Sequence, residues 1–194
     1  MEIFCYFSRL MYYAQPIKNQ GGKNMLSQKM EKELNNQVNA EMYSAYLYLA
    51  MSAYFEDQNL PGFANWMYVQ AQEEMTHAMK IYRFIFSRGG KVELKAIEEP
   101  PREWDDAVKV AQEVYEHEQK VTAMIHNLVN LAREEKDYGT DQMLQWFVSE
   151  QVEEEDNADE LLQQLKLIGG KGQGLLMLDR ELSTRQFVDE TQQE

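Results

Sequence analysis

Apolar residues recur along most of the chain at alternating steps of three and four, which is the spacing of a helix that packs against partner helices. Capping and breaking residues divide this pattern. Ser27 is a candidate N-cap, the pair Gly89 and Gly90 ends one segment, "DYGT" makes a turn, and "GGKGQG" ends another. The predicted helices cover residues 28–57, 61–88, 104–136 and 140–168, followed by a short helix over 175–185.

The connection between the second and third helices, residues 89–103, is unusually long. With Pro100 and Pro101 it could span up to about 50 Å when extended, and a helix of about 28 residues is about 42 Å long. The connection can therefore cross the whole bundle. We predict an all-α fold, a four-helix bundle with one long crossover between helices two and three, in which helices two and three run parallel.

Each predicted helix has an apolar seam that is interrupted near its middle by acidic residues. Because the interruptions fall near the helix centres, antiparallel or parallel pairing brings them to about the same level. An ionised carboxylate left unpaired in a core costs several kcal/mol, and no Lys or Arg lies on any seam. The seams carry Glu41, then Glu74 with His77, then Glu118, and last Gln151 with Glu154.

This polar level favours a site for metal cations. Carboxylate oxygens with one imidazole suit iron, manganese or zinc ahead of copper, and two metal ions fit the ligand set better than one. Glu41 and Glu118 could each serve one metal, while Glu74 bridges with His77 beside it. A Glu-x-x-His pair alone more often faces solvent, so the prediction rests on the four seams together. Histidines 117 and 126 lie off the third seam, and we predict that they are surface residues.

Composition narrows the functional class. The formal net charge of −14 argues against nucleic acid as a partner, since there is no basic surface to neutralise phosphates. The single cysteine, Cys5, excludes a Cys-x-x-Cys metal knot and favours a cytoplasmic protein. The apolar runs in residues 1–24 are too short to span a membrane. We interpret residues 1–24 as a mis-assigned or disordered extension before a start at Met25, rather than as a functional arm.

Four blocks of sequence resemble the ferritin family, most closely its haem-free bacterial members. They are "NAEMYSAYLYLAMSAYFE", "EEMTHAMK", "VYEHEQKVT" and "QWFVSEQVEEE", and the resemblance covers residues 25–185, leaving 186–194 as a tail. It implies a subunit of a hollow 24-subunit shell. It also implies oxidation of Fe(II) by dioxygen or peroxide at a di-iron ferroxidase centre, without haem, and storage of ferric mineral. The segment "GLLMLDRELSTRQF" resembles the family's short fifth helix.

The resemblance also implies roles for individual residues. Glu41, Glu74, His77 and Glu118 would hold the first iron, and Gln151 would help to complete a second site that Glu74 bridges. Tyr48 resembles a family tyrosine that hydrogen-bonds a ligand and donates an electron. A third, more labile site would use Glu73, Glu150, Glu153 and Glu154. In this chain "QVEE" replaces a second Glu-x-x-His, which argues against bacterioferritin and predicts a looser second iron.

Other functional classes share parts of this pattern. A rubrerythrin-like peroxide-reducing protein needs a Cys₄ iron domain, which one cysteine cannot build. A DNA-protecting miniferritin would usually place its site between subunits and often carries basic tails. A mineral scaffold or helical interaction protein would have a degenerate site, and the joint presence of Glu41, Glu74, His77 and Glu118 disfavours it.

Overall fold

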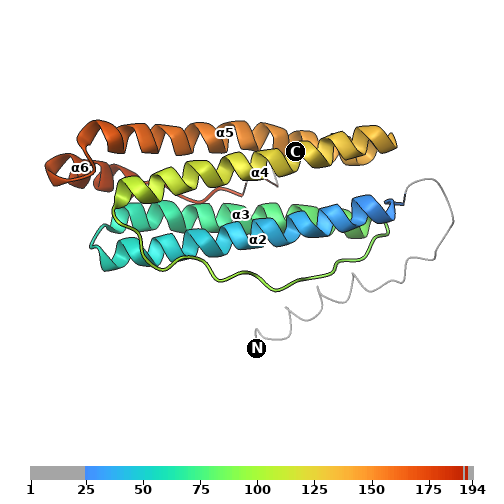
Figure 1. The fold of residues 1–194 in the computed structure, drawn as a ribbon, viewed down its shortest axis with the longest axis horizontal. Helices are drawn as coiled ribbons and strands as arrows, with labels where there is room; N and C mark the ends of the chain where they lie inside the picture. The colour runs from blue at the N-terminus through green and yellow to red at the C-terminus, as the bar shows by residue number, and fades with distance from the viewer. Residues whose placement is uncertain (1–24, 190, 192–194) are drawn as a thin grey trace, which may run out of the picture.

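The computed structural model describes residues 25–189 and residue 191, and the regular secondary structure within these limits is helical (Figure 1). The predicted all-α fold is confirmed. The interpretation of residues 1–24, with Cys5, falls outside the described residues. The helices are α2 (Gln28–Asp57), α3 (Pro61–Ser87), α4 (Ala107–Glu135), α5 (Tyr138–Ile168) and α6 (Gly172–Leu182).

Short polar side chains fix where the long helices begin. The Ser27 hydroxyl accepts a hydrogen bond from the Met30 amide at 2.9 Å, as predicted for the N-cap of α2. The third helix was predicted to begin at Trp104, and this is wrong. Asp106 accepts from the Lys109 amide and caps α4, so Trp104 lies before the helix, although its side chain is buried.

Three other predicted helix boundaries are displaced. The "DYGT" stretch was expected to form a turn, yet only its first residue, Asp137, lies outside a helix. Its carboxylate accepts a hydrogen bond from the Thr140 amide at 3.2 Å, and this cap starts α5 at Tyr138. The last helix begins at Gly172 and ends at Leu182, three residues earlier at each end than predicted.

The long connection between α3 and α4 runs along the outside of the bundle beside α2 (Figure 1). One amide side chain pins it. Asn35 donates to the Lys91 carbonyl at 2.9 Å and accepts from the Glu93 amide at 2.7 Å. Because the connection covers the length of the bundle, α3 and α4 run parallel, and the predicted one-crossover topology is confirmed.

Helix α6 packs across the start of α3 and supplies its cap. The residue before α3, Leu60, has no capping side chain, and the buried carboxylate of Asp179 instead accepts from the amides of Gly62 and Phe63 at 2.8 and 3.1 Å. A Cβ at Gly62 would lie 1.5 Å from the Asp179 carbonyl oxygen. Only glycine at this position allows the two helices to approach so closely.

The hydrophobic core is divided into two clusters at opposite ends of the bundle. One contains Phe55, Phe63 and Leu165, and the other contains Ile81, Ile125 and Phe147. Each cluster takes residues from all four long helices, and the buried acids Glu41, Glu74, Glu118 and Glu154 lie between the two clusters. The predicted level of interrupted seams is therefore present. None of the helices described is long and apolar enough to cross a membrane.

Candidate metal centre

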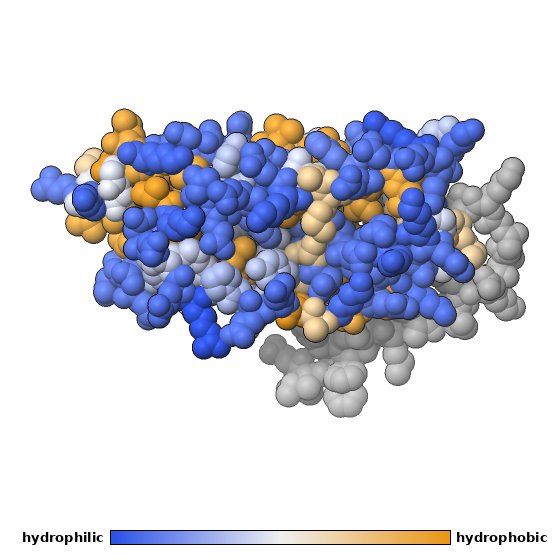
Figure 2. Space-filling model, viewed as in Figure 1, coloured by the Kyte–Doolittle hydropathy of each residue, from blue (hydrophilic) through white to orange (hydrophobic). Residues whose placement is uncertain are grey.

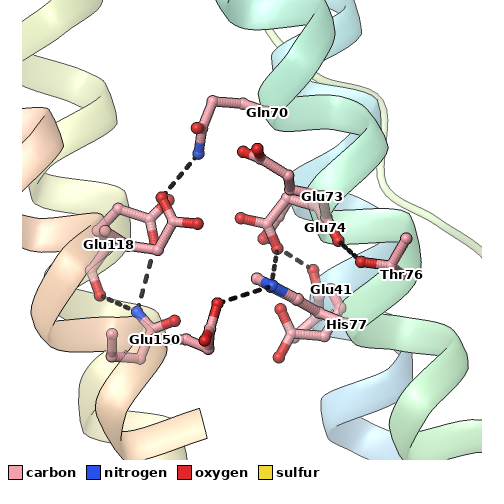
Figure 3. A network of polar contacts seen from close by, with 12 residues as sticks. Glu41, Gln70, Glu73, Glu74, Thr76, His77, Glu118 and Glu150 are labelled. Carbon is pink, nitrogen blue, oxygen red and sulfur yellow. Dashed lines mark hydrogen bonds and ion pairs between the residues drawn. The ribbon is translucent and has the colours of Figure 1, made fainter. Parts of the chain in front are cut away.

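Three predicted ligands from two helices meet inside the bundle. Glu41 comes from α2, and Glu74 and His77 come from successive turns of α3. One ligand atom from each lies within 4.8 Å of the other two (Figure 3). The i, i+3 spacing places Glu74 and His77 on one face of α3, where the His77 Nδ1 lies 3.6 Å from a Glu74 carboxylate oxygen. This set of donors can hold a metal ion.

The other pair of helices presents Glu118 and Gln151 toward the same level. The Tyr48 hydroxyl donates a short hydrogen bond to one Glu118 oxygen. The Gln151 amide nitrogen lies 3.3 Å from the other Glu118 oxygen and 3.2 Å from the Thr122 hydroxyl. With Nε2 directed to these acceptors, the amide oxygen of Gln151 remains available as a neutral ligand.

Burial dominates the electrostatics of the centre. Glu41, Glu74 and Glu118 are each 1% exposed. Burial raises the pKa of Glu118 to about 8, with a further contribution from the charge of Glu154. Burial also raises the pKa of Glu74 well above its usual range, and the charges of Glu118 and Glu41 add to this. The pKa of Glu41 is raised by burial as well. Without a cation, the interior therefore opposes full ionisation of these carboxylates.

Several oxygen atoms of this polar layer lack a hydrogen-bond partner. Gln37 donates to one Glu41 oxygen at 2.8 Å, but the buried Oε2 atoms of Glu41 and Glu74 have no hydrogen bond within the described part of the protein. The Oε1 of Gln70 is in the same condition. Once these carboxyl groups are ionised they are acceptors only, and their buried oxygen atoms are the ligands that a hard cation would bind. The chemistry of this set fits iron.

A second acidic group surrounds a hollow beside this centre, which we call the outer hollow. Its volume is about 40 Å³, and His77 forms part of its wall. His77 Nε2 lies 3.9 Å from a Glu150 carboxylate oxygen, whereas Glu154 is buried and accepts from Gln70 at 2.8 Å. All four acids predicted for a third site line this hollow: Glu73, Glu150, Glu153 and Glu154.

One histidine differs from its prediction. His126 is exposed as expected, but His117 is half-buried, so its assignment to the surface is wrong. Its Nε2 shares a hydrogen bond with the Ser44 hydroxyl at 2.8 Å, and its ring packs against Tyr43 and Tyr48. Burial, assisted by the charge of Lys120, lowers the His117 pKa to about 4, so the ring is neutral at pH 7.

Sequence reasoning missed several residues around the centre. Gln70 lies four residues before Glu74 on the seam of the second helix, which is a signal in the sequence. Gln37 and Thr122 lie on the flanks of seams and carry no signal in the apolar period. Arg185, which was assigned to the short helix, lies beyond it and lines the outer hollow. No periodic pattern places a residue after the last helix, so only the folded chain shows this contact.

Comparisons with known proteins agree with this architecture. The sequence model of the ferritin family, described as a ferritin-like domain, matches residues 31–168. The bacterial non-heme ferritin of Bacteroides fragilis (strain 638R) is 40% identical over 161 residues, which are 83% of this chain and 100% of that protein. That of Staphylococcus aureus (strain MRSA252) is 38% identical over 166 residues, 86% of this chain and 100% of that protein.

Solved structures give the same result. An open pore ferritin from the hyperthermophilic archaeon Archaeoglobus fulgidus is 55% identical and superposes with a TM-score of 0.82. The match covers 83% of this chain and 98% of that chain. An engineered closed form of the Archaeoglobus fulgidus ferritin is also 55% identical, with a TM-score of 0.83 over 84% of this chain and 99% of that chain.

Proposed function

Because the chain belongs to the ferritin family of iron-storage proteins, we propose that it oxidises Fe(II) inside each bundle and stores the ferric product within a shell built from its own copies. The proposed ferroxidase centre uses Glu41, Glu74, His77 and Glu118, with Gln151 completing a second iron site. Iron is the substrate, dioxygen or peroxide is the oxidant, and no haem takes part. The relatives support a homo-oligomer, and we propose a shell of 24 subunits.

The observation that carries this proposal is the unsatisfied carboxylate layer. Glu41 and Glu74 are each 1% exposed, and each has a buried oxygen without a hydrogen bond within the described residues. A purely structural core would be more stable with apolar side chains at these positions. The layer is explained if Fe(II) ions neutralise the carboxylates and take up their unsatisfied oxygens.

Each side chain then has a defined task. Iron supplies the electrons for reduction of the oxidant. Glu74 and Glu118, whose pKa values are raised in the metal-free protein, lose their protons as cations arrive, and the carboxylates balance the extra charge when Fe(II) becomes Fe(III). The neutral amide of Gln151 is a weaker ligand than a carboxylate. We therefore propose that the second iron leaves after oxidation and that the centre passes iron onward.

Tyr48 is placed to act on the centre through Glu118. Its hydroxyl donates to that carboxylate, and the phenol is fully buried. Burial and the charge of Glu118 raise the pKa of Tyr48 well above its usual range, so the phenol keeps its proton. In the proposed function it orients Glu118 and supplies an electron to the oxidant, while its phenolic proton passes along the hydrogen bond to Glu118.

The surface supports assembly. Hydrophobic residues gather at the end of the molecule formed by α6 (Figure 2), where Leu176 and Met177 are 53% and 71% exposed. Exposed apolar groups on a short helix at one end of a bundle are expected to pack against other copies. We propose that α6 contacts symmetry-related α6 helices in the shell.

The test combines rapid Fe(II) oxidation with metal binding. Glu74→Ala should abolish the fast phase of oxidation in air and remove tight Zn(II) binding measured by calorimetry, because it deletes the bridging ligand. Glu160→Ala, an exposed acid on α5, is the matched control and should leave both unchanged. An unchanged initial rate in Glu74→Ala would contradict the site assignment. Slow oxidation by the unmodified protein would favour the mineral-scaffold alternative.

A further inference from the structure

The chain that follows α6 turns back toward the middle of the bundle (Figure 1). We call residues 183–189 the return segment. Asn65 on α3 holds its beginning, because the Asn65 amide donates to the carbonyl of Leu182 at 3.2 Å and to that of Arg185 at 3.0 Å. Since the Asp179 carboxylate already fixes α6 against α3, the return segment starts from an anchored position.

Arg185 extends from this segment into the outer hollow. Its Nη2 lies 2.7 Å from a Glu73 carboxylate oxygen, and its guanidinium carbon lies 4.7 Å from the centre of the Trp66 ring. Val188 of the same segment also lines the hollow. The ion pair joins the return segment directly to one of the acids that line the outer hollow.

The charge of Arg185 is unusual in this position. A guanidinium keeps its proton at any pH at which the protein is folded. Among the described residues that line the outer hollow, Arg185 is the one lysine or arginine, and it faces four glutamates. The hollow has a volume of about 40 Å³, enough for only a few water molecules. A metal cation bound there would meet a fixed positive charge at close range.

The guanidinium is held in a way that permits its displacement. Its Nη1 is buried and has no hydrogen-bond partner in the described chain, so this donor loses its hydrogen bonds to water without replacing them. The Arg185 and Glu73 side chains remain 23% and 18% exposed, so water limits the strength of their ion pair. Moving outward would hydrate Nη1, while the Trp66 face could still hold the guanidinium plane.

We propose that Arg185 is a built-in competitor of metal cations at the outer hollow, and that a cation binding to Glu73 and its neighbours displaces Arg185 and loosens the return segment. This inference rests on the proposed function, because it concerns how iron moves beyond the buried centre. Without metal, the guanidinium neutralises part of the acidic charge. When a cation arrives, Arg185 leaves, and the competition keeps that cation weakly bound and ready to move on.

Zn(II) calorimetry on the assembled, iron-free protein tests the competition with a redox-inert probe. Arg185→Gln should bind Zn(II) about tenfold more tightly in the weaker class of sites, because an ion pair no longer has to be broken. Arg185→Lys, which keeps the charge, should change this affinity less. Arg180→Gln is the matched control: it removes the same charge from an exposed position on α6 and should stay within about twofold of the unmodified protein.

Hydrogen–deuterium exchange with mass spectrometry tests the displacement itself. In the unmodified protein, peptides covering the return segment should exchange faster at the Zn(II) concentrations that fill the weaker sites. A purely electrostatic effect of Arg185 would leave this exchange unchanged and would overturn the inference. Equal weak-site affinity in Arg185→Gln and the unmodified protein, or no weak sites in either, would overturn it as well.

The two proposals fail in different ways. Absence of tight Zn(II) sites from the unmodified protein and from all these variants would count against the buried centre and hence the proposed function. A normal tight class, combined with a weak class that does not respond to Arg185→Gln, would count against the competition alone.

Discussion

Replacing Glu118 by glutamine removes an ionisable group from the middle of the core while keeping its volume. In the folded, metal-free protein the pKa of Glu118 is raised to about 8 by burial and by the charge of Glu154, against 4.5 for an exposed glutamate. The folded protein therefore binds this proton more tightly than the unfolded chain does. Below pH 4.5 the carboxyl is neutral in both states and costs nothing. As the pH rises toward 8, the folded state loses stability.

The size of this effect follows from the two pKa values. Each tenfold difference in proton affinity is worth about 1.36 kcal/mol. For Glu118 this gives a loss of about 3 kcal/mol at pH 7 and about 5 kcal/mol well above pH 8, as upper limits. Glu118→Gln cannot ionise. The variant should therefore match the unmodified protein near pH 4.5 and be more stable than it by up to these amounts at higher pH.

Urea unfolding of metal-free protein at fixed subunit concentration, followed by circular dichroism from pH 4.5 to 9, measures the difference. Glu160→Gln is the control, because that side chain is exposed on α5. Zn(II) should remove most of the difference at pH 7, since metal at 100 times its dissociation constant adds about 2.7 kcal/mol to a protein that binds it. A Glu118→Gln variant that follows the pH profile of the unmodified protein, or gains equally from Zn(II), would refute the reasoning.

Three further substitutions test other parts of the structure. Gln151→Glu should tighten the second iron site by adding a charged ligand, so more iron should stay with the centre after oxidation. Anaerobic Fe(II) titration measures the affinity of the two sites. Two equally tight sites in the unmodified protein would contradict this prediction. Tyr48→Phe removes a donor to ionised Glu118 and should cost about 1–3 kcal/mol of metal-free stability above pH 8. The cost should be smaller near pH 4.5, where the bond goes to a neutral carboxyl, as urea unfolding would show. Gly62→Ala places a Cβ against the Asp179 carbonyl and should detach α6, which faster hydrogen exchange over residues 172–182 would report; unchanged exchange would exclude this close packing as the reason for glycine.

Much of the fold could be predicted because its information is local. Helical period and caps such as Ser27 located the long helices, and the length of the connection before Pro100 and Pro101 gave the topology. The common level of Glu41, Glu74 and Glu118 followed from rigid helix geometry, since interruptions near the middle of paired helices must meet. Whether these residues bind iron remains a prediction.

The predictions that were wrong or incomplete depend on local caps and tertiary contacts, which the apolar period of the sequence does not show. Trp104 continues the apolar seam and is buried, but Asp106 offers a better cap two residues later. His117 stands on the flank of a seam, where neighbouring α2 covers it through Ser44 and Tyr43. The position of Arg185 is set by tertiary contacts of the return segment, which has no regular structure and therefore no periodic pattern in the sequence.

The division of the core explains how the protein tolerates its central layer. An interior that holds Glu41, Glu74 and Glu118 without a cation opposes their ionisation, and this would favour opening of the bundle at that level. Opening would have to separate the helices at two apolar clusters, one on each side, and each cluster joins all four long helices. The ligands therefore stand on rigid helices fixed above and below, so their positions are set before metal arrives. Stability lost in the layer is offset by the apolar clusters, and the outer hollow, with Arg185 against Glu73, is the part of the polar network left free to rearrange.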